Sequence, residues 1–83
     1  MSEINVIIRT ADQTRKAEVT LDSGNNGGDV IQAAVDNWSL PTDTDYSLVN
    51  ATSGKAVAPR SALGESGVKE GDILEVQPVL VAG

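Results

Sequence analysis

A strict alternation of apolar and polar residues in two neighbouring segments most constrains how this chain can fold. Residues 3–9 and residues 16–21 both alternate in this way. The positions that share one face are apolar in each segment: Ile4, Val6 and Ile8 in the first, and Ala17, Val19 and Leu21 in the second. A period of two residues is typical of a strand with one buried face. Because a short polar stretch joins the two segments, we predict a β-hairpin.

The hydrophobic period changes after this hairpin. At about 100° per residue, the apolar residues from position 29 onward fall within an arc of about 140°, which predicts an amphipathic helix. They are Val30, Ile31, Ala34, Val35 and Trp38. The Gly- and Asn-rich segment 22–28 predicts a flexible loop, with Gly28 or Asp29 as the N-cap of the helix. Because a proline disfavours helical backbone in the residue before it, the helix is expected to end near Leu40, before Pro41.

The rest of the chain predicts more strands and no second long helix. Short strands are expected at residues 46–50, 56–58 and 73–78, and one tight helical turn at residues 61–68. The predicted order is β-β-α-β-β-β, an α+β architecture in which one helix packs across one face of a mixed β-sheet. The first and last strands are the most apolar, so we expect them to pair in the centre of the sheet.

Length and composition exclude many functions. The 83 residues predict a single domain over residues 1–78, followed by a flexible C-terminal tail at residues 79–83. Without Cys or His, the chain lacks a thiol nucleophile, a thiolate metal site and the commonest general base. We therefore expect a protein that is not an enzyme, with no catalytic residues, no metal and no cofactor. The net charge of -6 disfavours binding to nucleic acid or to anionic membranes.

Two further patterns concern the cellular location. No apolar run approaches the roughly 20 residues that a membrane-spanning helix needs. The first residues do not form the basic and then apolar pattern of a signal peptide. The expectation is a cytoplasmic protein without a membrane span.

The segment from Leu63 to Val76, LGESGVKEGDILEV, resembles the ubiquitin-like β-grasp family. In that family a short helical turn carries a leucine, a glycine and an aliphatic residue follow, and Gly-Asp leads into the last strand. The matching residues here are Leu63, Gly67, Val68, Gly71 and Asp72. The resemblance covers nearly the whole chain and implies a β-grasp fold, in which Leu63 and Val68 close the open end of a half-barrel.

Three branches of this family differ in function, and the first is the ubiquitin-like modifiers. The resemblance implies that an activating enzyme adenylates the carboxylate of Gly83, that a conjugating enzyme acts with it, and that a peptidase trims or releases the modifier. Such sets of proteins are encoded in bacterial operons. Glycine suits this position because a Cβ would block a narrow channel in the partner enzyme. The chain departs from the family at Ala82, where most modifiers have a second glycine. Val79, Leu80 and Val81 form an apolar tail, which indicates a partner-binding segment.

The other two branches remain open. YukD-like components of bacterial type VII secretion systems act non-covalently and generally stop near the last strand, whereas five residues follow Pro78 here. Sulfur carriers of cofactor synthesis also use a C-terminal glycine, as an acyl adenylate and then a thiocarboxylate. They nearly always end in Gly-Gly, and this chain ends in Ala82-Gly83.

A few single residues are candidates for contacts with partners. Val49 matches the outward aliphatic position that ubiquitin uses for receptors, and its companion on the last strand is Gln77, so this candidate surface is partial. The candidate acceptor lysines for chain formation are Lys16, Lys55 and Lys69. Trp38 lies on the apolar face of the helix and is expected in the core. Self-association is a further candidate interaction.

Overall fold

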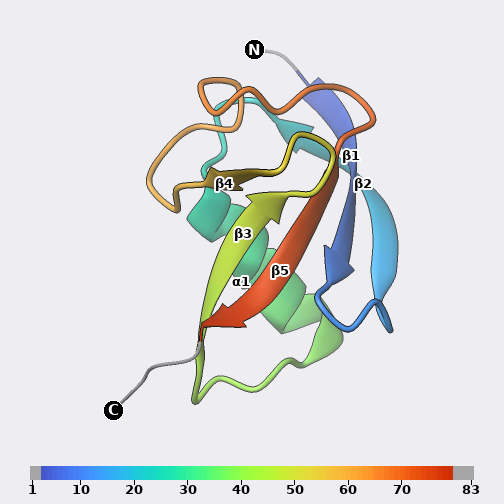
Figure 1. Cartoon of the computed structure of the whole chain (residues 1–83), viewed down its shortest axis with the longest axis vertical. Coiled ribbons are helices and arrows are strands. Elements are labelled where there is room, and N and C mark those ends of the chain that lie inside the picture. The colour runs from blue at the N-terminus through green and yellow to red at the C-terminus, as the bar shows by residue number, and fades with distance from the viewer. Residues whose placement is uncertain (1–2, 80–83) are drawn as a thin grey trace.

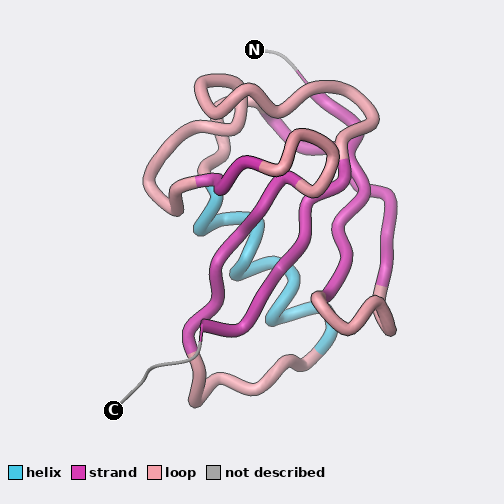
Figure 2. The backbone as a smooth tube through the Cα atoms, in the orientation of Figure 1, coloured by secondary structure: helices cyan, strands magenta, loops and turns pink. Residues whose placement is uncertain are grey.

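The six expected elements are present in the expected order (Figure 1). The computed structural model describes residues 3–79. The strands are β1 (Glu3–Thr10), β2 (Lys16–Asp22), β3 (Asp45–Asn50), β4 (Lys55–Val57) and β5 (Ile73–Val79), and the helix is α1 (Gly27–Trp38). The predicted α+β architecture is confirmed, because α1 crosses one face of the sheet (Figure 2).

The sheet has the strand order β2-β1-β5-β3-β4. β1 and β5 are parallel and central, as the sequence predicted, and the other neighbouring strands are antiparallel. The predicted hairpin is also confirmed, because β1 pairs with β2 from Glu3 opposite Asp22 to Arg9 opposite Lys16.

The core lies between the inner face of the sheet and α1. The alternation in β1 buries Val6 and Ile8, and the corresponding face of β2 is partly buried. Leu63 and Val68 are buried in the same cluster, at 0% and 5% exposure, which agrees with their expected place at the open end. The buried apolar residues are Val6, Ile8, Val30, Ala34, Leu48, Val57, Leu63, Val68, Leu74 and Val76.

The helix begins earlier than the sequence predicted, so an N-cap at Gly28 or Asp29 is wrong. Asn26 is the N-cap: its side chain accepts a hydrogen bond from the N–H of Asp29, and the Asp29 side chain accepts one from the N–H of Asn26. Gly27 is buried as the first helical residue, where a Cβ would lie 2.8 Å from the carbonyl oxygen of Ala58. The end of the Gly-rich loop is therefore packed against the rest of the domain.

The helix also ends two residues before the expected Leu40. Ser39 adopts a left-handed conformation, with φ of 51°, and its N–H donates to the carbonyl of Val35. Trp38, the last helical residue, is half-buried and packs against the core without being enclosed by it. Its expected burial is thus met only in part.

The chain enters β5 through a turn that pins it to β1. Gly71 has a φ of +85°, which residues with a Cβ rarely adopt, and its N–H donates to the carbonyl of Asn5. Residues 61–68 form tight turns rather than a regular helix. At its other end β5 includes Val79, which the sequence assigned to the tail.

Candidate functional site

The outer face of the sheet, away from α1, carries the side chains that the sequence proposed as a partner surface. Val49 on β3 lies opposite Glu75 on β5, and the next outward residue of β5 is Gln77, opposite Ser47. Val49 and Gln77 are therefore diagonal neighbours on one face. Both are half-buried.

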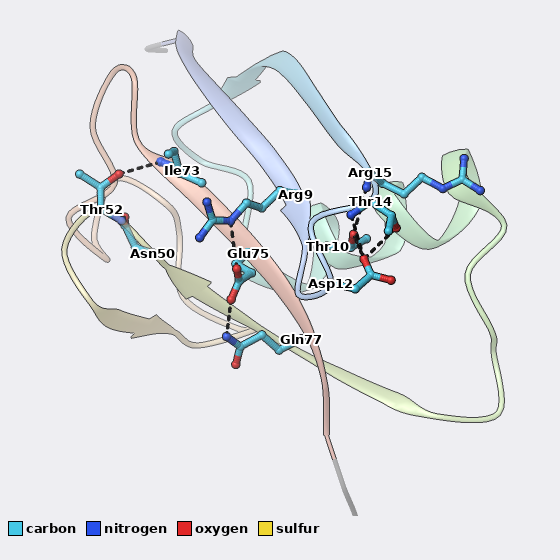
Figure 3. A network of polar contacts seen from close by, with 10 residues as sticks. All are labelled: Arg9, Thr10, Asp12, Thr14, Arg15, Asn50, Thr52, Ile73, Glu75 and Gln77. Atoms are coloured by element: carbon cyan, nitrogen blue, oxygen red, sulfur yellow. Dashed lines mark hydrogen bonds and ion pairs between the residues drawn. The ribbon is translucent and has the colours of Figure 1, made fainter.

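A polar cluster occupies the centre of this face (Figure 3). Arg9 Nε donates to Glu75 Oε1 at 2.9 Å, and Gln77 Nε2 donates to the second carboxylate oxygen at 2.6 Å. The hydrogen bond from Gln77 is the largest cause that lowers the pKa of Glu75, and Arg9 lowers it further against the opposing effect of desolvation. With 25% and 14% of their side chains exposed, Arg9 and Glu75 form a partly shielded ion pair across the two central strands.

This cluster determines what the face can bind. Ile7 on β1 lies beside Ile73 on β5, and both are half-buried on the outer face together with Val49. The aliphatic side chains thus flank a fixed polar centre, so a partner would need hydrogen-bonding groups as well as apolar ones.

A second feature lies near the end of β5. A hollow of about 460 Å³ is lined by apolar side chains that include Leu40, Tyr46 and Pro78, and by the carboxylates of Asp12 and Asp43. The Tyr46 hydroxyl donates to the carbonyl of Pro41 at 2.7 Å, which fixes the ring. No local sequence pattern reveals this hollow, because its walls come from three separate parts of the chain.

The carboxylate of Asp12 is held in place within the β1–β2 turn (Figure 3). It accepts hydrogen bonds from the Thr10 hydroxyl at 2.6 Å and from the N–H and hydroxyl of Thr14 at 3.1 and 2.8 Å. These bonds, that from Thr10 first, lower the pKa of Asp12 from 3.8 to about 2. The spacing Thr-x-Asp-x-Thr was a readable sign of such a turn.

Comparison with solved structures identifies the fold. The structure of Caldiarchaeum subterraneum ubiquitin is similar with a TM-score of 0.78 and 23% sequence identity, over 99% of this chain and 100% of that chain. A designed protein based on ubiquitin is similar with a TM-score of 0.76 and 18% identity, over 98% of this chain and 95% of that chain.

The chain has the ubiquitin-like β-grasp fold. No protein-family model matches it, and no curated protein matches its sequence. The likeness is therefore one of structure, and the resemblance that the residues 63–76 indicated is confirmed at the level of the fold.

In this ubiquitin-like domain the predicted tail begins at the surface. Val79 is 39% exposed. Within residues 3–79, it is the one large apolar residue that is exposed. It closes β5 opposite Asp45. The other tail candidates, Leu80, Val81, Ala82 and Gly83, lie outside the described residues.

The three candidate acceptor lysines are exposed, and Lys16 lies apart from the other two. Lys16 begins β2, whereas Lys55 begins β4 and Lys69 precedes β5. Lys55 and Lys69 line one polar hollow of about 380 Å³, together with Thr52, Ser53 and Asp72. Their role as acceptors stays a prediction.

Two other findings concern residues 3–79 only. Within that part of the chain, no group of three or more acidic side chains could hold a metal ion. The single helix there is too short and too polar to cross a membrane.

Proposed function

We propose that this chain is a protein modifier of a bacterial ubiquitin-like conjugation pathway. The observation that carries the proposal is the structural similarity to an archaeal ubiquitin over the full length of both chains. In the proposed reaction the Gly83 carboxylate attacks the α-phosphate of ATP on an activating enzyme and displaces pyrophosphate. The resulting acyl adenylate loses AMP when the acyl group is transferred, and a conjugating enzyme directs it to a target lysine amine, which forms an isopeptide bond.

Features of the described residues support this assignment of roles. β5 ends with an exposed Val79, the first residue of the proposed partner-binding tail. A segment from Val79 to Val81 would give a partner enzyme apolar contacts beside Ala82 and Gly83. The outer sheet face with Val49 and Gln77 would supply a second, non-covalent contact. A peptidase of the same pathway would release the modifier, and all these partners act in the cytoplasm.

The experiment compares covalent adducts made by variants of the last residue. Tagged chain is incubated with lysate of its host and ATP, and adducts are detected on denaturing gels and by mass spectrometry. Deletion of Gly83 should abolish them. The matched control removes one residue at the other end, Ser2, and should retain them. The intact mass of the chain purified from its host should correspond to a C-terminus at Gly83.

Two outcomes would replace this proposal. If the wild type forms no ATP-dependent adduct while the Gly83 deletion keeps full biological activity, a non-covalent role is favoured, as in a YukD-like secretion component. The half-buried aliphatic residues Ile7, Val49 and Ile73 on the outer face would then be the contact surface. A thiocarboxylate at Gly83 without protein adducts would instead indicate a sulfur carrier.

A further inference from the structure

The two edges of the sheet differ in how well they are protected. β4, at one edge, has three residues, whereas β2, at the other, has seven. Short edge strands, charged side chains, prolines and bulges are the usual protection against pairing with another chain, and of these β2 has only charges. β2 contains no proline and pairs with β1 in an unbroken register. Within residues 3–79 no strand lies on its other side (Figure 1).

The backbone of β2 offers free hydrogen-bonding groups on that open side. The N–H of Thr10 donates to the carbonyl of Arg15 at 3.0 Å, so these residues form a hydrogen-bonded pair next to the turn. Antiparallel pairs alternate, which directs the groups of Ala17 and Val19 toward β1. The same alternation directs the N–H and C=O groups of Glu18 and Thr20 away from β1, where a further strand could pair with them.

The charges along the outer face of this hairpin are separated by sign. At one end Lys16 lies directly opposite Arg9, and at the other end Asp22 lies directly opposite Glu3. Like charges that face each other across a sheet are destabilising. Neither Lys16 nor Asp22 therefore faces an opposite charge on β1.

We infer that β2 is a self-association surface, on which two copies of this chain pair antiparallel about a two-fold axis at Val19. Val19 is the middle residue of β2, so this register pairs the whole strand. Lys16 then lies opposite Asp22 of the second copy at both ends. Glu18 lies opposite the neutral Thr20, so no like charges face each other directly across the new pair. The inference is independent of the chemistry proposed for Gly83.

The inner side of β2 supports the same pairing. A groove of about 400 Å³ runs between β2 and α1, and its walls include Val19, Leu21, Ala33 and Trp38. In the proposed register Val19 meets Val19, and Ala17 meets Leu21, on this same side of the joined sheet. The second copy would thus cover the open side of the groove and further bury the half-exposed Trp38.

The net charge of -6 on each copy does not prevent this contact at physiological salt. Charges further apart than about 8 Å are largely screened there, whereas residues opposite each other on paired strands are about 5 Å apart. The local complementarity of Lys16 and Asp22 then outweighs the distant repulsion.

The test measures association of the full chain by sedimentation at physiological salt over micromolar to millimolar concentrations. Lys16→Glu places a like charge opposite Asp22 twice and should weaken the dimer by about tenfold. The matched control Lys55→Glu makes the same charge change at the β4 edge and should leave the dimer unchanged. Asp22→Lys should also weaken it. An equimolar mixture of the Lys16→Glu and Asp22→Lys chains should associate again, because both charge pairs become attractive.

Amide hydrogen exchange of the wild type gives a readout that needs no variant. The N–H groups of Glu18 and Thr20 should exchange fast in dilute protein and slowly in concentrated protein, whereas Val19 should be protected in both. A chain that stays monomeric at millimolar concentration overturns the inference. So does a dimer that Lys16→Glu and Lys55→Glu weaken equally, or one in which Glu18 and Thr20 gain no protection.

Discussion

At the scale of single residues, Asn50 ties two loops to the sheet. It is 1% exposed, and its Nδ2 donates to Asp72 Oδ2 at 2.8 Å. Its Oδ1 accepts from the N–H groups of Thr52 at 3.0 Å and Ser53 at 3.3 Å. One buried amide thus holds the β3–β4 turn and the entry to β5 in place.

Asn50→Ala should therefore lower the free energy of unfolding by about 2–3 kcal/mol, because it leaves buried polar partners unpaired. Urea unfolding measures the loss. The control is Asn37→Ala, which removes an exposed side chain whose amide bonds the carbonyl of Ala33 on the helix surface. That change should stay within about 0.5 kcal/mol of the wild type. Equal losses in the two variants would mean that the Asn50 bonds do not stabilise the fold.

The candidate site shows which residue-level features a sequence can reveal. The family resemblance pointed to Val49 and Gln77, and in the structure the two are diagonal neighbours on the outer face; their role in partner binding stays a prediction. The ion pair of Arg9 and Glu75 was missed because the two residues are 66 positions apart. Only the parallel register of β1 and β5 brings them together, and no local pattern contains that register.

At the scale of elements, the N-terminus of α1 is built by a capping box. Asn26 and Asp29 exchange hydrogen bonds of 2.8 and 3.2 Å between side chain and backbone. Asn26 also forms an isolated bridge with Ala62, which connects the start of the helix to the turn that carries Leu63.

Asn26→Ala should destabilise the domain by about 1 kcal/mol, because the first helical turn loses its side-chain acceptor. The neighbouring Asn25→Ala is the matched control. Asn25 contributes backbone hydrogen bonds to Asp22 and Leu63, which the substitution keeps. Thermal or urea unfolding of both variants measures the difference. A larger loss for Asn25→Ala than for Asn26→Ala would contradict the assignment of the cap.

The same helix shows the limit of reading elements from sequence. The periods of two and of 3.6 residues predicted the strands and the helix face, because each burial pattern is local. The cap was misplaced because Gly27 and Gly28 resemble loop residues. Position 27 has no room for a Cβ, which would lie 2.8 Å from the carbonyl oxygen of Ala58, a residue far along the chain, and no local pattern reveals that contact. The last residue of β5 was missed for the same reason, since Val79 is held in the strand by its pairing with Asp45.

At the scale of the whole molecule, the chain has an excess of acidic residues, and hydrogen bonds stabilise the ionised form of some of their carboxyl groups. Within residues 3–79, three carboxyl groups have a lowered pKa: Asp12 through Thr10 and Thr14, Glu70 through Asn5, and Glu75 through Gln77 and Arg9. Each stabilises the fold while it is ionised. Since the folded pKa lies below the unfolded one, this stabilisation is present above the unfolded pKa and is lost as the pH falls through the folded pKa.

Acid should therefore destabilise the domain. The contribution of Asp12 is the one for which a pH range can be given. Its pKa falls from 3.8 to about 2, so its contribution should decrease as the pH falls between these values. Over that range the unfolding free energy of the wild type should drop more steeply than that of Asp12→Asn, which cannot ionise. Urea unfolding at a series of pH values gives both curves.

The control for this acid window is Asp43→Asn, which removes one negative charge from the same hollow. Asp43 accepts no hydrogen bond within residues 3–79, so this variant should retain the steep acid limb of the wild type. If Asp43→Asn flattens the curve as much as Asp12→Asn does, general charge repulsion rather than the Thr10 and Thr14 bonds governs acid stability. A curve for Asp12→Asn as steep as that of the wild type would show that the Asp12 turn does not couple folding to pH.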